Sequence, residues 1–301
     1  MKTPQSSFPN LATALGVPEL WLKREDLHHF GSHKGRSIPF MIDHYWHKEK
    51  LTNFVISSSG NAAFAAALHA QHHNTNNPDQ LISLKIFVGN KIPAEKLSKL
   101  TELVDKQILI EQVENPRQVA FQVDAKGEAK LLRQSTDDLA LKGYQELAEE
   151  LNHIPNLQAI FIPTSSGTTA QALGEAFQNL EQKPQIHIVQ TKAVHPIADS
   201  FQTVMCPTNG KFVADPETSI AGAIVDKVAN RKFPVVDIIL KSNGSGWIVT
   251  DDQIRAAIEL VKSKTSIDIS PNRALSVAGV MESQLFDRKF GGAVVCLVTG
   301  V

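Results

Sequence analysis

One segment of this chain reads Phe161-Ile162-Pro163-Thr164-Ser165-Ser166-Gly167-Thr168-Thr169-Ala170. Its apolar beginning predicts a buried strand, its small and hydroxylated middle predicts a turn, and the residues from Ala170 onward predict a helix. A strand followed by a tight turn and a helix is the repeating step of α/β folds. Ligands of open α/β sheets bind at the carboxyl ends of strands, so this turn is also a candidate binding site.

The same step recurs along the chain. Further short apolar runs, rich in Val and Ile, predict buried strands at 54–56, 82–88, 186–189 and 293–298. Because these runs are continuous rather than alternating, we expect both faces of each sheet to be covered. The sequence therefore predicts an α/β fold with mostly parallel sheets and flanking helices.

The segments between these runs have helical periodicity. Apolar residues recur at helical spacing over 254–261, and Thr250 with Gln253 predicts a capping box that begins this helix. A second amphipathic helix is predicted over 139–151. The Asn- and His-rich segment 72–79 is predicted to be a polar loop.

The composition excludes several classes of protein. The 301 residues include 30 Lys and Arg against 31 Asp and Glu, so a net charge of -1 gives no electrostatic footprint for nucleic acid or an anionic membrane. No apolar stretch approaches the ~20 residues that span a bilayer, and the N-terminus lacks the apolar core of a signal peptide. Two cysteines, Cys206 and Cys296, cannot form a disulfide framework, and Cys296 is expected to be buried. We expect a cytoplasmic protein that binds neither nucleic acid nor membrane.

Two turns have the chemistry of anion sites. The small residues at 165–169 let backbone N–H groups approach an anion at a helix N-terminus, and their hydroxyls add donors, which suits a phosphate. The turn at 58–61 precedes a helix predicted over 62–70 and suits a carboxylate. Judged alone, each turn is also compatible with an ordinary strand-to-helix connection or helix cap.

Lys34 lies close to two glycines in a polar turn. It is compatible with a Schiff-base lysine, whose amine must lose its charge, and also with a solvated surface charge. Eight histidines lie between residues 28 and 73. No Cys or carboxylate joins them at ligand spacing, so no metal site is predicted.

Four segments in this order resemble the pyridoxal-phosphate (PLP) enzymes of the tryptophan-synthase-β fold type, or fold type II. This superfamily includes threonine synthase, serine/threonine dehydratase and cysteine synthase. The resemblance covers nearly the whole chain, and its other segments are 58–62, 165–169 and 298–300. The first segment matches the family patterns K-x-E-x-L and G-S-x-K-x-R with Lys23, Glu25, Leu27, Gly31, Ser32, Lys34 and Arg36.

The resemblance implies a role for each matching residue. Lys34 holds PLP and, once the substrate displaces it, removes the α-proton. Asn61 lies beside the 3-hydroxyl of the cofactor, and Thr299 meets its pyridine nitrogen. The substrate-carboxylate turn corresponds to Ser58, Ser59, Gly60, Asn61 and Ala62. The phosphate loop corresponds to Ser165, Ser166, Gly167, Thr168 and Thr169, with one glycine where the family often has three or four.

The resemblance also implies two open, twisted, mostly parallel sheets, with PLP in the cleft between two domains. The larger, cofactor-binding domain is expected to comprise residues 1–37 and 143–301. The smaller, mobile domain is expected to comprise residues 38–142 and to carry the carboxylate turn. We expect a homodimer that acts on a small amino acid.

The residue opposite the pyridine nitrogen bears on the reaction. A threonine hydroxyl cannot keep that nitrogen protonated as a carboxylate does, so the ring is a milder electron sink. This suits α-proton removal and loss of a β or γ leaving group more than transamination. We therefore expect a PLP-dependent lyase similar to threonine synthase or serine/threonine dehydratase, which the segments 218–222 and 298–300 favour over cysteine synthase.

Three alternatives stay open. One is cysteine-synthase-like β-replacement. Another is a non-catalytic descendant that binds PLP or an amino acid, because 270–274 lacks the family's Glu-Pro and the chain ends soon after Thr299. The third is a hydrolase with Ser165 or Ser166 as nucleophile, which ranks last because no G-x-S-x-G elbow is present.

Overall fold

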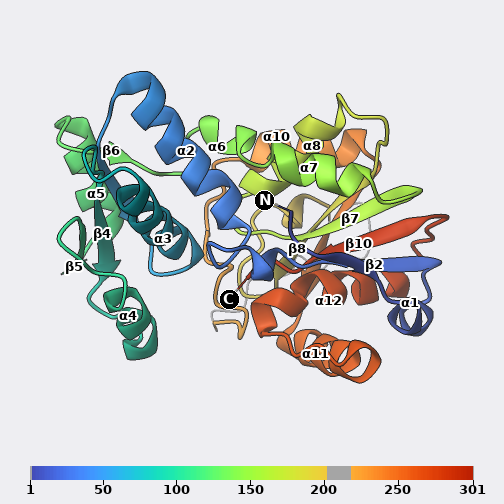
Figure 1. Ribbon diagram of the computed structural model, residues 1–301. Coiled ribbons are helices and arrows are strands. Elements are labelled where there is room, and N and C mark those ends of the chain that lie inside the picture. The colour runs from blue at the N-terminus through green and yellow to red at the C-terminus, as the bar shows by residue number, and fades with distance from the viewer. Residues whose placement is uncertain (1, 202–217, 301) are drawn as a thin grey trace. The chain divides into compact units, whose positions relative to one another are not determined.

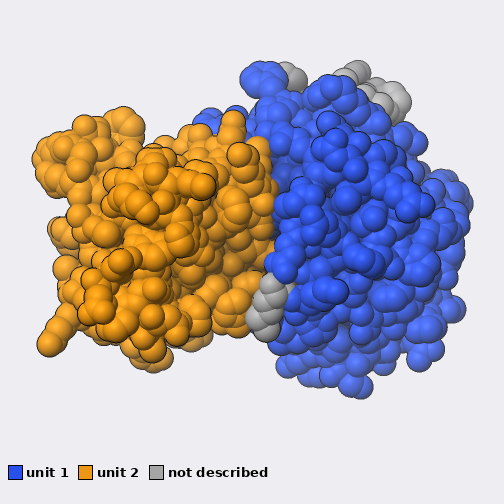
Figure 2. Space-filling view, turned by 45° about the horizontal axis from the view of Figure 1, so that its top comes forward, with its two compact units in different colours: residues 1–27, 144–301 blue, residues 28–143 orange. Residues whose placement is uncertain are grey.

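The computed structural model describes residues 2–201 and 218–300. The chain forms two compact units, which are coloured separately in Figure 2: residues 1–27 and 144–301 make unit 1, and residues 28–143 make unit 2. Each unit has its own sheet and its own hydrophobic core. Cys206 lies outside the described residues. The expected mobility of residues 38–142 stays a prediction.

Unit 1 is built on a six-stranded sheet in the order β1-β2-β10-β7-β8-β9 (Figure 1). Its neighbouring strands are parallel, except that β1 pairs antiparallel with β2 at one edge. The strands are β1 Gln5–Ser7, β2 Glu19–Lys23, β7 Leu157–Pro163, β8 Gln185–Thr191, β9 Ser245–Val249 and β10 Ala293–Leu297. The helices are α1 Pro9–Leu15, η1 Glu25–Leu27, α7 Gln145–Asn152, α8 Thr168–Phe177, α10 Lys232–Lys241, α11 Asp251–Thr265 and α12 Pro271–Leu285.

Helices cover both faces of this sheet (Figure 1). On one face α12 packs against β7, β8 and β9, and α11 packs against α12. On the other face α8 and α10 pack against β8, and α7 packs against α8. Strand β7 is buried at nearly every position, as expected for a continuous apolar strand between two helical layers.

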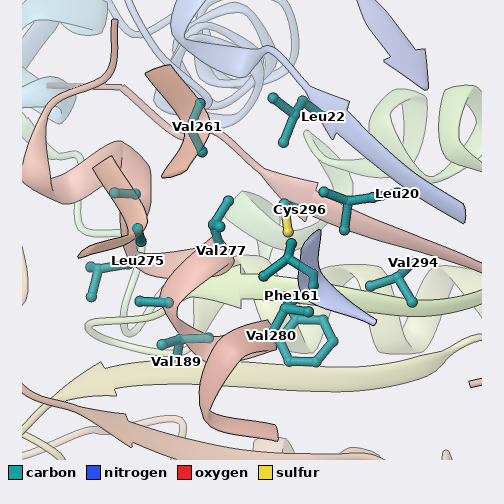
Figure 3. Packing of buried hydrophobic residues seen from close by; sticks show 14 of the residues in the cluster. Leu20, Leu22, Phe161, Val189, Val261, Leu275, Val277, Val280, Val294 and Cys296 are labelled. Carbon is teal, nitrogen blue, oxygen red and sulfur yellow. The ribbon is translucent and has the colours of Figure 1, made fainter. Parts of the chain in front are cut away.

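Cys296 of β10 lies in the core between the sheet and α12 (Figure 3). Its side chain is fully buried in a cluster that includes Leu20, Leu22 and Val277. Burial raises the pKa of the Cys296 thiol, so it stays protonated at neutral pH. The expectation that Cys296 is buried is confirmed.

Unit 2 is built on a four-stranded parallel sheet in the order β5-β4-β3-β6. Its strands are β3 Asn53–Ser57, β4 Ser83–Gly89, β5 Ile108–Val113 and β6 Lys130–Leu131. Its helices are α2 Lys34–Glu49, α3 Asn61–Asn76, α4 Ala94–Thr101, α5 Pro116–Ala125 and α6 Leu139–Lys142.

The central strand β3 is buried on both faces. Phe54 and Ile56 join the cluster formed with α2 and α3, whereas Val55 packs with Phe87 and Ala120 below α5. Successive side chains of a strand point to opposite faces, so each needs an apolar partner on its own side. This explains why the sequence of β3 is apolar at consecutive positions.

The predicted fold class is confirmed: both sheets are mainly parallel and carry flanking helices. The predicted strands correspond to β3, β4, β7, β8 and β10. The capping box of Thr250 and Gln253 begins α11. Within the described ranges, no helix combines the length and the apolar character needed to cross a bilayer.

The single helix predicted over 139–151 is wrong, because α6 and α7 are separate helices. The break falls at Gly143 and Tyr144, where the chain passes from unit 2 to unit 1. A Cβ atom at Gly143 would lie 2.6 Å from the Cα atom of Ser37. Gly143 therefore allows a close backbone approach to α2, which a periodic pattern alone does not reveal.

The polar loop predicted over 72–79 is wrong for its first half, because α3 continues to Asn76. Polar residues in this last turn bind the backbone that follows the helix. His73 Nε2 lies 3.1 Å from the Gln80 carbonyl oxygen, and the Asn74 amide bonds both the N–H and the carbonyl of Ile82, at 2.8 and 2.9 Å. The polar side chains thus connect α3 to the start of β4 rather than interrupting the helix.

The core of unit 1 contains a buried histidine. His187 of β8 stacks on Phe161 at 4.5 Å between ring centroids. Trp247 Nε1 donates to His187 Nδ1 at 3.1 Å, so the ring proton is on Nε2, which faces Gln185 Oε1 at 3.1 Å. Burial, with a smaller effect of Arg288, lowers the pKa of His187 to about 3.

The lowered pKa of His187 makes the stability of unit 1 depend on pH. Below the unperturbed histidine pKa of about 6.5, the unfolded chain takes up a proton that the folded chain does not. The stability that the lowered pKa of His187 gives to the folded state is therefore fully present above about pH 6.5, and it is lost as the pH falls toward 3. His187→Gln keeps an acceptor oxygen for Trp247 and removes the titration. We predict that the loss of unfolding free energy between pH 6.5 and 4.5 will be about 2 to 3 kcal/mol smaller in this variant.

Urea denaturation of the two proteins at a series of pH values measures this difference. Between pH 7 and 8, where His187 does not titrate in either state, the two stability curves should run parallel. Equal slopes below pH 6.5 would show that His187 is protonated in the folded protein.

Candidate active site

The phosphate loop and Thr299 lie at the same edge of the unit 1 sheet. Strands β7 and β10 are parallel neighbours, with Cys296 opposite Phe161. Thr299 and Thr164 each lie three residues beyond this pair, just past the carboxyl ends of their strands. Neighbouring strands are about 4.8 Å apart, so the loop after β7 and the segment after β10 are adjacent. The structure thus brings these two predicted parts of the site together.

The N-terminus of α8 is suited to an anion. Gly167 is its N-cap residue with φ +93°, a left-handed conformation that favours glycine. The first-turn N–H groups of a helix lack intrahelical partners, and among the described residues no side chain caps this end. Thr168 and Thr169 are buried in this first turn, and Thr168 Oγ1 lies 3.0 Å from Ser166 Oγ.

Residues of β8 hold the start of this loop in place through hydrogen bonds. Thr164 N donates to the Val189 carbonyl at 2.9 Å, and Gln190 Nε2 donates to the Thr164 carbonyl at 3.2 Å. Gln190 is fully buried, and its Oε1 accepts bonds from the backbone N–H groups of Ile197 and Ala198. Gln190 was not predicted as part of the site. The spacing between Gln190 and its hydrogen-bond partners follows no helical or strand periodicity, so the sequence gives no sign of them.

Thr299 is buried beside a charged cluster. Asp26 N donates at 2.8 Å to the carbonyl oxygen of Val298, the residue before Thr299. Arg24 donates two bonds of 2.8 Å to the Asp26 carboxylate, which raises the pKa of Arg24. Arg273 Nη1 lies 3.6 Å from the same carboxylate. The end of β10 is therefore held in place by η1 and by the first turn of α12.

The segment 218–226 crosses the same edge and is bound near three helix N-termini. Ser219 Oγ donates to Asp251 of α11 at 2.6 Å, and Ala223 N donates to Asn272 of α12 at 3.0 Å. Ser165, just before α8, binds the backbone of residues 225 and 226. The match at 218–222 pointed to this segment, and Ser165 belongs to a predicted loop, but the hydrogen bonds that join the two have no sequence signal.

In unit 2, Lys34 is the first residue of α2, directly after the N-cap residue His33. The next residue, Gly35, lies against His28: a Cβ atom at Gly35 would be 2.3 Å from His28 Nδ1 and 2.8 Å from Phe30 Cβ. His28 Nδ1 in turn accepts the Phe30 N–H at 3.2 Å. The loop before Lys34 is therefore shaped by a histidine ring that fits only because residue 35 lacks a side chain.

The carboxylate turn lies at the carboxyl end of β3 and begins α3. Gly60 is the N-cap residue of α3, and within the described part of the chain no side chain caps this helix. Gly60 N donates to Ser58 Oγ at 3.3 Å. A Cβ atom at Gly60 would meet no atom within 4 Å. The turn from Ser58 to Ala62, with Ser59 and Asn61, thus has room for a ligand beside its backbone.

These donor sets fit the chemical parts of PLP. The N-terminus of α8 offers N–H groups and hydroxyls to a phosphate, and Thr299 offers a neutral hydroxyl to a ring nitrogen. The edge near Thr299 also has polar atoms to satisfy: Ser270 Oγ and Arg273 Nε are buried without a hydrogen-bond partner in the structure as described. Residues 2–201 and 218–300 contain no group of three or more His, Cys, Asp or Glu side chains that could hold a metal ion.

Comparison with known families decides the assignment. The model of the family described as "Pyridoxal-phosphate dependent enzyme" matches residues 1–300. This chain belongs to that family. The cofactor expected from the sequence, PLP, is thereby confirmed, and so is the resemblance to the fold type II enzymes.

The curated relatives of this PLP-dependent chain have several activities. Serine racemase from Dictyostelium discoideum is 25% identical over 99% of this chain and 89% of its own length. Threonine synthase from Methanocaldococcus jannaschii is 23% identical over 99% of this chain and 74% of its own length. A catabolic L-threonine dehydratase from Staphylococcus aureus is 23% identical over 99% and 83%.

Solved structures of PLP enzymes share the fold. Maize serine racemase has a TM-score of 0.82 at 19% identity, covering 100% of this chain and 88% of that one. A pyridoxal 5'-phosphate-dependent aspartate racemase has a TM-score of 0.79 at 18% identity, covering 100% and 90%. At these identities the likeness extends to the fold, not to the substrate.

The contact between Gly35 and His28 predicts a stability effect in this PLP-dependent protein. Gly35→Ala places a methyl group onto the His28 ring, and such overpacking costs about 1–3 kcal/mol of unfolding free energy. The same change in a His28→Ala background should cost less, because the ring atoms nearest the methyl group are removed, while the contact with Phe30 Cβ remains. Denaturant unfolding of the two single variants and the double variant measures the coupling.

Gly222→Ala is the matched control, because a Cβ atom there would meet no atom within 4 Å. It should leave the unfolding free energy within about 0.5 kcal/mol of the wild type. If Gly35→Ala behaves like this control, the described contact with His28 does not exist in solution.

Proposed function

We propose that this protein is a PLP-dependent lyase that catalyses elimination or replacement at the β or γ carbon of an amino acid, similar to threonine synthase or serine/threonine dehydratase. The observation that supports this most directly is Thr299, which lies at the carboxyl end of β10 next to the phosphate loop. A neutral hydroxyl at the pyridine nitrogen favours proton removal and elimination over transamination.

The residues of both units have distinct tasks in this proposal. The first turn of α8, with Ser166, Gly167, Thr168 and Thr169, binds the phosphate. The N-terminus of α3, with Ser58, Ser59, Gly60 and Asn61, binds and orients the substrate carboxylate. When bound, PLP supplies the electron sink for the reaction.

Lys34 performs the acid–base chemistry. Its Nζ would hold the cofactor and, once released as a neutral amine, would act as a base. That amine accepts the α-proton from the substrate carbon. The lysine must lose its charge to do this.

The two groups of residues belong to one site in this proposal. Residues 1–37 with 143–301 would form the cofactor-binding domain, and residues 38–142 would form the mobile domain that carries the carboxylate turn. Family members of this kind act on small amino acids, and we propose a cytoplasmic homodimer with such a substrate. The alternatives to this reaction are cysteine-synthase-like β-replacement and a non-catalytic role in binding PLP or an amino acid.

A second candidate reaction is racemisation. It is favoured by the matches to the two serine racemases and to the aspartate racemase. Racemisation and elimination share the removal of the α-proton, and they differ in whether the proton returns to the opposite face or a leaving group departs. Racemisation and elimination are therefore distinguished by their products and not by the sequence.

The first test of this proposal is Lys34→Ala. Without the amine, the purified protein should lack the visible absorbance of a lysine-bound cofactor, and substrate turnover should fall by at least about 10³-fold because the base is absent. Lys48→Ala is the matched control, since Lys48 is an exposed residue of the same helix. Full turnover in Lys34→Ala would contradict the assignment.

The second test compares the wild type with Thr299→Asp across a panel of L-amino acids, with products identified by chromatography. Wild type should release a keto acid or exchange a side-chain group. Thr299→Asp holds the pyridine nitrogen protonated, so part of the turnover should shift to transamination. A wild type that only inverts the α-carbon is a racemase. A wild type that yields no product from any amino acid contradicts an enzymatic function.

A further inference from the structure

Ser165 belongs to the predicted phosphate loop, but its hydroxyl is directed to another part of unit 1. Ser165 Oγ donates to Asp226 Oδ2 at 2.9 Å. The same oxygen accepts the backbone N–H groups of Val225 and Asp226, each at 3.2 Å. A hydroxyl has one donor and two acceptor positions, so these three bonds use its full capacity.

We propose that Asp226 is a positioning residue for the cofactor phosphate, acting through Ser165; this inference rests on the proposed function of the loop at 165–169. Ser165 is then no ligand of the phosphate. It is the point at which the segment 218–226 attaches to the loop. The phosphate is held by the backbone N–H groups and hydroxyls of the residues that follow Ser165.

The charge of Asp226 argues for an indirect role. A carboxylate repels a phosphate dianion, so a direct contact between the two would weaken binding. The Asp226 carboxylate instead accepts from Ser165 Oγ, on the side of the loop that precedes α8. Its effect on the phosphate is therefore to fix where the loop backbone lies.

The loop is also restrained by packing around Gly167. A Cβ atom at Gly167 would lie 2.9 Å from Val235 Cγ2, 3.2 Å from Ile197 Cδ1 and 3.4 Å from Arg231 Cβ. Arg231 is buried, and its Nη1 donates to Gln171 Oε1 of α8 at 2.9 Å. The loop is thus restrained by Val235, Ile197 and Arg231 around Gly167, in addition to the bond between Ser165 and Asp226. Loss of either restraint lets the N–H donors move.

This arrangement fits a loop with a single glycine. Consecutive glycines let the backbone approach a phosphate closely without side-chain obstruction. Here Ser166 is next to the one glycine and Ser165 precedes it, and the Ser165 side chain must be kept out of the phosphate's path. Asp226 does this for Ser165 by binding its hydroxyl. The inference predicts that Asp226 matters for the phosphate group of the cofactor and for no other part of it.

The experiment measures two affinities for each variant: that of PLP, and that of pyridoxal, which lacks the phosphate. Protein stripped of cofactor is titrated with either compound, and binding is followed by absorbance. The variants are Asp226→Ala, Asp226→Asn, Ser165→Ala and the double variant Ser165→Ala with Asp226→Ala. The controls are Asp237→Asn, an exposed aspartate of α10, and Ser263→Ala, an exposed serine of α11.

Asp226→Ala should weaken PLP binding about tenfold, since one hydrogen bond that orders the loop is lost, and should change pyridoxal binding less than twofold. Asp226→Asn should stay close to wild type, because its amide oxygen still accepts from Ser165. Ser165→Ala should weaken PLP binding at least as much as Asp226→Ala, because it removes the bond to Asp226 together with the two bonds that Ser165 Oγ accepts. The double variant should be no worse than Ser165→Ala, because the bond to Asp226 is then already lost. Both controls should bind both compounds as the wild type does.

Three results would overturn the inference. Equal losses of PLP and pyridoxal affinity in Asp226→Ala would indicate a general structural role. A loss of PLP affinity in Ser165→Ala with none in Asp226→Ala would show that the bond to Asp226 does not order the loop. Tighter PLP binding in Asp226→Asn would show direct repulsion between Asp226 and the phosphate. Failure of the wild type to bind PLP more tightly than pyridoxal would instead refute the proposed function of the loop itself.

Discussion

Strand β10 forms backbone hydrogen bonds with β2 on one side and β7 on the other, and the arrangement of unit 1 depends on these two pairings. The last strand of the chain thereby joins its N-terminal strands to the strands that follow unit 2. Parallel strands align their carboxyl ends, so Thr299, the loop after β7 and η1 after β2 are brought to one edge. A slip of β10 by one residue would turn Cys296 to the opposite face of the sheet and move Thr299 along the strand direction by about 3.3 Å.

Both units use the same local design for their candidate sites. A buried strand ends, a small-residue turn follows, and a helix begins without a side-chain cap in the structure as described: β7 with α8 in unit 1, and β3 with α3 in unit 2. Each helix N-terminus offers N–H donors to an anion. One cofactor and one amino acid together carry a phosphate and a carboxylate, which is why two such turns suit a PLP enzyme better than either turn would alone.

The sequence predicted most of the scaffold, because strands buried on both faces leave a continuous apolar signal and Thr250 with Gln253 caps its helix through local bonds. It did not predict the break at Gly143, which depends on a close approach of Ser37, more than a hundred residues earlier. The partner of Ser165 could not be predicted either, since Asp226 lies 61 residues away. His28 and Gly35 are near in sequence, but their contact depends on the shape of the loop. Periodicity and capping are local signals, whereas these contacts are consequences of tertiary packing.

The proposal on which the others depend is that Lys34 is the lysine that holds PLP. Reduction of the holoenzyme with borohydride fixes PLP covalently to the lysine that holds it, and peptide mapping by mass spectrometry then identifies that lysine. We predict one pyridoxyl label per chain, on the peptide that contains Lys34. When excess amino-acid substrate is present before reduction, this label should be lost. A label on Lys23, Lys142 or any other lysine would contradict it.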